Sequence, residues 1–160
     1  MNVYCPILVG GQYLPARSMN RSMPGGRDES PRIEWSDVPT ETKSFCLTIS
    51  DLDAGPQPQT LWSIINIPYE IRAFLPNASL ATELLPSECV QLTNALGNQR
   101  YDGPSLLPDS PPHRISFELI ALSVQKLNVG LFTPVEERLK TIRSKMIDRA
   151  SLDAMATRSR

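Results

Sequence analysis

The chain has 160 residues, a formal net charge of −1, 15 prolines, three cysteines and one histidine. This length suits a single domain, predicted over residues 1–160, with its own hydrophobic core. The near-neutral charge argues against a nucleic-acid partner, which requires a basic surplus. One histidine and three scattered cysteines exclude a multi-histidine metal site and a four-ligand zinc site. The prolines argue against an all-helical bundle, because each removes a hydrogen-bond donor and interrupts a helix.

The start of the chain predicts no targeting signal, because no basic segment precedes an apolar stretch and Pro6 follows almost at once. No window approaches the roughly 18 apolar residues of a membrane span, so no stable membrane insertion is expected. Cys5, Cys46 and Cys89 lack any Cys-x-x-Cys spacing, which favours free thiols in a reducing cytoplasm. A cytoplasmic protein without a cofactor or a metal is therefore expected.

Short strands dominate the predicted elements. In chain order they are expected near residues 11–14, 33–35, 44–50, 61–67 and 114–124. Segment 44–50 alternates, with Phe45, Leu47 and Ile49 on one side, which is the period of a half-buried strand. Segment 61–67 is almost entirely apolar and β-branched, which indicates a central strand covered on both faces.

A helix is predicted near the end of the chain, with Thr133 as N-cap, Pro134 at the first position and Glu136 completing a capping box. Its apolar face is expected to comprise Val135, Leu139, Ile142, Met146 and Ile147. Its basic residues, Arg138 among them, are interpreted as a solvated face because acidic residues are interleaved. Strands joined by loops favour a mainly β fold, an antiparallel β-sandwich with peripheral helices that include this C-terminal helix.

Two segments are candidates for chemistry. Asp51 and Asp53 follow a strand, and carboxylates two residues apart on an extended chain project to the same side. Such a pair can order a cation, orient an imidazolium or accept hydrogen bonds from a ligand. The alternative interpretation is a turn in which both side chains accept hydrogen bonds from loop amides.

The second candidate combines Gly103 and Pro104 with His113, which precedes the long strand. Glycine and proline allow backbone amides to line a concave site, and an imidazole can donate to an anionic oxygen. The alternative is a surface histidine in a proline-rich loop. Common nucleophile, zinc-protease and phosphate-loop motifs are lacking.

Taken together, these segments resemble the phosphatidylethanolamine-binding protein family, also called Raf-kinase-inhibitor-like, and most closely its compact bacterial and archaeal branch. The resemblance rests on the order Ser30-Pro31, Ile33-Glu34-Trp35, Val38-Pro39, Thr42-Lys43-Ser44-Phe45, Asp51-Leu52-Asp53-Ala54, Asn66-Ile67-Pro68, Tyr101-Asp102-Gly103-Pro104 and His113-Arg114. It implies a β-sandwich with a small pocket for phosphate-like or acetate-like ions and phospholipid head groups. The ligand-binding residues that it implies here are Asp51, Asp53, Gly103, Pro104 and His113.

Two pocket positions depart from the family pattern. Leu61 stands where the family has a histidine, and Ile115 where it has a tyrosine. Each lost hydrogen bond to a charged ligand is worth about 1.5–3 kcal/mol. The pocket is therefore expected to favour a less polar or less charged ligand, or to have lost head-group binding.

Three functions follow. The first is a non-catalytic binding or regulatory protein with a small anion or head-group pocket of altered polarity. The second is a protein-interaction module, similar to kinase modulators, with a vestigial pocket and a protein partner; the resemblance also implies a homodimer. The third is a hydrolase with His113 as general base, for which the sequence names no nucleophile.

Overall fold

The computed structural model describes residues 1–158, so the last two residues of the predicted 1–160 domain lie outside the described part. In chain order the elements are β1 (Asn2–Tyr4), the 3-10 turn η1 (Ala16–Ser18), β2 (Ile33–Ser36), β3 (Ser44–Asp51), β4 (Gln59–Pro68), β5 (Ala73–Phe74), the 3-10 turn η2 (Thr82–Leu84), β6 (Val90–Leu92), β7 (His113–Leu122), α1 (Val135–Lys145) and β8 (Met146–Ala156).

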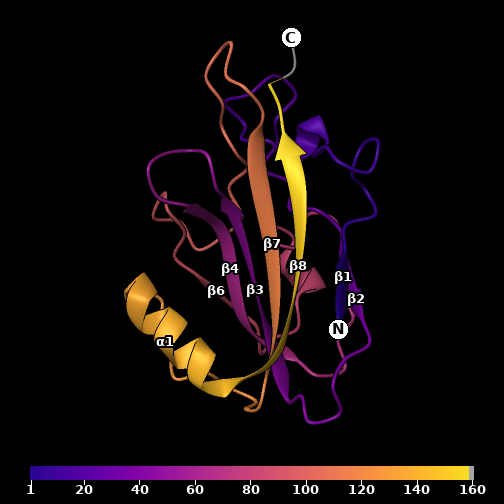
Figure 1. Cartoon of the computed structure of the whole chain (residues 1–160), viewed down its shortest axis with the longest axis vertical. Coiled ribbons are helices and arrows are strands. Elements are labelled where there is room, and N and C mark those ends of the chain that lie inside the picture. The colour runs from indigo at the N-terminus through magenta and orange to yellow at the C-terminus, as the bar shows by residue number, and fades with distance from the viewer. Residues whose placement is uncertain (159–160) are drawn as a thin grey trace.

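Two antiparallel sheets form the fold (Figure 1). The smaller sheet has the order β1-β2-β5 and the larger has the order β6-β4-β3-β7-β8. The main core contains side chains of both sheets: the ring of Trp35 on β2 lies 5.7 Å from Phe45 on β3 and 5.5 Å from Phe74 on β5, centroid to centroid. The predicted mainly β, sandwich-like fold is confirmed.

Strand β3 shows why the alternating sequence pattern was informative. Phe45, Leu47 and Ile49 are completely buried in the main core. Cys46, between them, belongs to a second apolar cluster on the opposite face of the sheet. The strands expected near 33–35, 44–50, 61–67 and 114–124 are all present. The strand expected near 11–14 is wrong, because Tyr13 forms only isolated bridges, with Val9 and Met155.

Strand β4 contains two β-bulges that determine which of its side chains face the main core. Ile49 pairs with Trp62 and Ser50 with Thr60, so Leu61 is an extra residue without a partner on β3. A second shift between Ile67 and Ile64 accommodates Asn66, whose φ of 59° is a conformation that asparagine tolerates. The bulges let Leu61 and Trp62 both enter the main core.

Helix α1 lies on the other side of the larger sheet from β1 and β2 (Figure 1). Its residue Ile142 is buried in the second cluster. The remaining buried members of that cluster come mainly from the outer face of the sheet: Cys46, Ile65, Leu92, Ile120, Leu122 and Leu127. Among the residues described, no helix combines the length and the apolar character needed to cross a bilayer.

The predicted helix is present, but its extension to Met146 and Ile147 is wrong. The helix ends at Lys145, and an eleven-residue strand, β8, follows and pairs with β7. The pattern from 150 to 156, in which Ala150, Leu152, Ala154 and Ala156 alternate with other residues, has the period of a strand. The predicted cap is also wrong, because the Thr133 hydroxyl accepts a hydrogen bond from the Gly130 amide instead.

Candidate functional site

Asp51 and His113 meet where β3 ends and β7 begins. Asp51 Oδ2 lies 2.8 Å from His113 Nδ1, and the Asp51 side chain is 1% exposed. Its other oxygen, Oδ1, accepts a hydrogen bond of 2.9 Å from the Asp53 amide. The carboxylate thus both orients the imidazole and organises the turn, which combines the two interpretations of this segment.

Asp53 forms a bidentate pair with Arg114. The distances from Asp53 oxygens are 2.9 Å to the Arg114 Nη2 and 3.1 Å to its Nε, and the Arg114 amide donates to Asp53 at 2.7 Å. These hydrogen bonds lower the pKa of the Asp53 carboxyl from 3.8 to about 2. Arg114 therefore offsets the negative charge of Asp53, and Asp51 is the carboxylate in direct contact with the imidazole.

The lowered pKa of Asp53 can be tested by titration. Because the folded-state pKa lies below the ordinary value, the contribution of the pair is present at neutral pH and is lost as pH falls through about 2. Carbon-detected NMR of the Asp53 carboxyl should give a midpoint near pH 2, and Arg114→Ala should return it toward 3.8. An Asp53 midpoint near 3.8 in the unmodified protein would contradict the bidentate geometry.

Ser110 is a neighbour of the site that the sequence patterns did not indicate. Its Oγ lies 3.4 Å from His113 Nε2, so Asp51, His113 and Ser110 follow one another in the order of a catalytic triad. However, the Ser110 hydroxyl donates at 2.8 Å to the Pro111 carbonyl. Pro111 and Pro112, which follow directly, have no N–H to stabilise an oxyanion.

Gly103 and Pro104 belong to a second group, held against the loop of residues 16–28. The Gly103 amide donates to Asp28 Oδ1 at 2.8 Å, and the Pro104 carbonyl accepts from the Asn20 amide at 3.1 Å. Glycine is required because a Cβ at residue 103 would lie 2.3 Å from the backbone of Ser18. Asp28 is 1% exposed and has a φ of 53°. No sequence motif indicated it.

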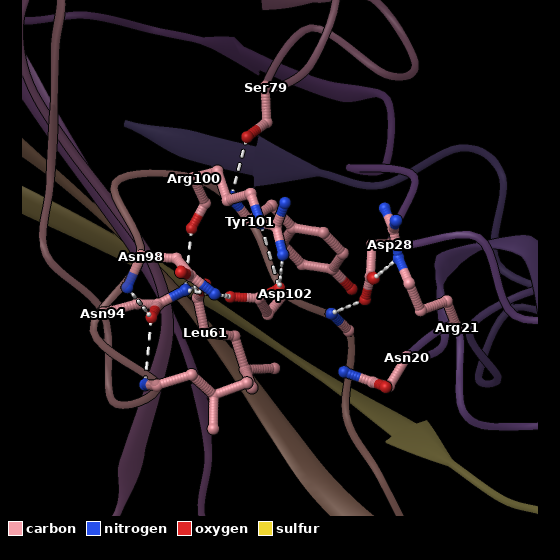
Figure 2. Close-up of polar contacts among 12 residues, drawn as sticks. Asn20, Arg21, Asp28, Leu61, Ser79, Asn94, Asn98, Arg100, Tyr101 and Asp102 are labelled. Carbon is pink, nitrogen blue, oxygen red and sulfur yellow. Dashed lines mark hydrogen bonds and ion pairs between the residues drawn. The ribbon is translucent and has the colours of Figure 1, made fainter.

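Asp102 contacts several of the side chains drawn in Figure 2. Its Oδ2 accepts hydrogen bonds of 2.7 Å from Asn94 and 2.8 Å from Asn98, and its Oδ1 lies 3.1 Å from Arg100 Nη2. Its amide donates at 3.1 Å to the carbonyl of Leu61, the bulged residue of β4. The bulge therefore provides an acceptor that fixes segment 101–104.

The five predicted ligand-binding residues thus form two groups. Asp51, Asp53 and His113 are joined by direct contacts, and no hydrogen bond within residues 1–158 links them to Gly103 or Pro104. Four hollows lie on the surface of the described part of the protein, and none of the five residues lines any of these four. The departures from the family pattern, Leu61 and Ile115, are 7% and 0% exposed and belong to the main core.

Comparison with known families agrees with the fold. Residues 8–157 match the family model described as phosphatidylethanolamine-binding protein. A UPF0098 protein of Aquifex aeolicus is 38% identical over 104 residues, which is 65% of this chain and 60% of that protein. The UPF0098 protein YbhB of Escherichia coli is 31% identical over 121 residues, 74% of this chain and 76% of that protein.

Two solved structures are similar along almost the whole chain. The crystal structure of Escherichia coli YbcL, described as a member of the mammalian PEBP family, has a TM-score of 0.89 at 24% identity and covers 99% of this chain and 98% of its own. The crystal structure of CT736 from Chlamydia trachomatis, described as a PEBP homologue, has a TM-score of 0.81 at 24% identity and covers 99% of this chain and 97% of its own. At this identity the likeness concerns the fold.

Proposed function

This chain belongs to the phosphatidylethanolamine-binding protein family, and from that premise we propose that it is a non-catalytic binding protein for a small anionic group. The group is of the kind found in acetate or in a phospholipid head group, and it binds beside Asp51, Asp53 and His113. The protein acts in the cytoplasm as a binding or regulatory component.

The observation that supports this proposal is the buried Asp51–His113 pair. With Nδ1 of His113 held by Asp51, Nε2 is the ring nitrogen that remains for a ligand. When the ring carries a proton on both nitrogens, Nε2–H lies beside a serine hydroxyl and suits an anionic oxygen. Leu61 and Ile115 add no polar donor, and Asp51 keeps a negative charge nearby, so a monoanion is favoured over a dianion.

The contacts of Ser110 support binding without catalysis. A serine nucleophile needs its proton directed at the base and a donor for the oxyanion. Here the Ser110 hydroxyl donates to Pro111, and prolines follow it. We therefore expect no hydrolysis of simple esters that is lost in Ser110→Ala; an activity of that kind would contradict the non-catalytic assignment.

Amide shifts in NMR test the binding proposal. Acetate is expected to move the signals of Asp51, Asp53 and His113, with a Kd of about millimolar order, and more strongly than phosphorylethanolamine. The response should vanish in His113→Ala and persist in Glu70→Ala, an exposed control. Unchanged signals at millimolar acetate, relative to sodium chloride, would remove the anion-binding proposal.

The position of Leu61 and Ile115 in the main core favours a second candidate, the interaction module with a vestigial pocket. In that case the protein binds its partner through its surface, and the contacts of Asp51, Asp53 and His113 only stabilise the fold. A protein partner, or a second copy of this chain, that is retained equally by the unmodified protein and by His113→Ala would support it. Loss of the partner together with acetate binding would favour the first proposal.

A further inference from the structure

Arg138 on α1 does not lie on a solvated helix face. The residue is 8% exposed, and its Nε is out of contact with solvent and without a hydrogen-bond partner. Within residues 1–158 no carboxylate lies within salt-bridge distance of it, although Glu136 and Glu137 are close in sequence. Burial also lowers the pKa of the guanidinium from its usual value.

A buried guanidinium Nε without a partner is costly, because this donor has lost water and gained no compensating contact. The side chain lines a hollow of about 40 Å³ between α1 and the outer face of the larger sheet. Three hydroxyl residues of β3 and β4 line the same hollow: Thr48, Thr60 and Ser63. Positive charge and hydroxyl donors thus line one recess.

The size of the recess limits the group that fits. A single water needs about 10–15 Å³, so about 40 Å³ accommodates a group of about three heavy atoms, such as a carboxylate. A carboxylate also matches the planar fork of a guanidinium, with two parallel hydrogen bonds. A tetrahedral phosphate is larger and more highly charged.

A wider groove of about 730 Å³ adjoins the recess and shares Thr48, Thr60, Val135 and Leu139 with it. Val135 and Leu139 are 51% and 39% exposed on the helix side. Leu52 and Pro58 add apolar surface, while Glu118 and Glu136 add negative charge. The groove therefore accepts a neutral, partly apolar chain and repels a second negative charge.

We propose that Arg138 anchors the carboxylate of an amphipathic monocarboxylate, whose apolar chain lies in the groove between α1 and the outer face of β3 and β4. This site is separate from the one beside His113. Thr48 neighbours the inward-facing Leu47 and Ile49 on β3, so it lies on the opposite face of the sheet from the main core. His113 lies two residues before the core residue Ile115 on β7, so it is on the face of the sheet that points to the main core.

Octanoate below its micellar concentration is the probe. It is expected to shift the amide signals of Thr48, Thr60 and Ser63, and to raise the melting temperature. The same carboxylate could also come from a peptide C-terminus, which N-acetyl-leucine mimics. If N-acetyl-leucine binds more strongly than octanoate, Arg138 is assigned to a peptide carboxylate. Octanol, which has the chain without the charge, should bind at least tenfold more weakly.

Arg138→Met keeps the apolar stem and removes the charge, and Lys140→Met is the matched control, because Lys140 is exposed on the same helix. Without ligand, Arg138→Met should melt at the same temperature or higher, since a buried Nε donor without a partner is lost. Its octanoate affinity should fall at least tenfold, with Lys140→Met within twofold of the unmodified protein.

Three outcomes would overturn the proposal. The first is an equal loss of octanoate affinity in Arg138→Met and Lys140→Met, and the second is an unchanged octanoate affinity in Arg138→Met. The third is a set of octanoate-induced amide shifts confined to Asp51 and His113. The last would place the carboxylate at the other site. Because the readout is by residue, the failure of either site leaves the test of the other intact.

Discussion

Gly103→Ala is expected to destabilise the protein by about 3 kcal/mol or more, because the added methyl group meets backbone rather than a movable side chain. The new Cβ would lie 2.3 Å from the carbonyl oxygen of Ser18 and from the carbonyl carbon of Met19, and 2.5 Å from the Asn20 nitrogen. Relief requires the loop of residues 16–28 to move away, which also strains the bond from the Gly103 amide to Asp28.

Urea unfolding monitored by the fluorescence of the buried tryptophans measures this loss. Gly55→Ala is the control, since its Cβ would meet only Gln59 Nε2, at 3.8 Å, and Gly55 does not require a positive φ. That variant should stay within about 1 kcal/mol of the unmodified protein. Similar unfolding midpoints for the two variants would show that segment 101–104 does not approach the loop as closely as described.

Asp102→Ala is the second substitution with a large expected effect, a loss of about 3 kcal/mol. Asp102 is 2% exposed, and its removal takes away the charged acceptor of the buried Asn94 side-chain amide, which keeps only the carbonyls of Leu61 and Arg100, and removes the acceptor of Asn98. The Tyr101 ring, whose hydroxyl donates at 2.7 Å to the Ser18 carbonyl, depends on the same segment. Thermal unfolding and the amide dispersion of residues 101–104 should both report the change.

Arg100→Ala distinguishes the contribution of the Arg100–Asp102 ion pair to stability from that of the hydrogen bonds from Asn94 and Asn98. Arg100 is 36% exposed, so its pair with Asp102 is screened by water, and its removal should cost less than about 1 kcal/mol. Asp102→Asn retains an acceptor and should fall between the two. If Arg100→Ala proved as damaging as Asp102→Ala, the ion pair rather than the asparagine contacts would hold the segment.

Strands β3 and β7 were predictable because period-two alternation is a local signal that survives in the fold. Strand β8 was not, because Met146 and Ile147 continue the apolar spacing of the preceding helix and hide the change of period at Lys145. Only pairing with β7, a contact distant in sequence, decides between helix and strand there.

The candidate site was likewise predictable only in part. The i, i+2 spacing of Asp51 and Asp53 predicted a shared function, and the structure gives them different partners, His113 and Arg114. Asp28 and Arg138 lie in stretches whose composition indicates a loop and a solvated helix face. Their burial comes from packing against segments far away in the chain, and a single sequence has no local pattern for that.

Strand β8 is at one edge of the larger sheet, and the beginning of the chain covers part of it. The Leu14 amide donates to the Met155 carbonyl, and the Met1 ammonium lies 3.3 Å from Asp148, 147 residues away in sequence. Closing so long a loop is slow, because chain entropy is lost before the contacts are gained. Refolding should therefore be rate-limited by the docking of the N-terminal segment on β8, and until then the uncovered edge of β8 is open to association with other chains, so the yield should fall as protein concentration rises.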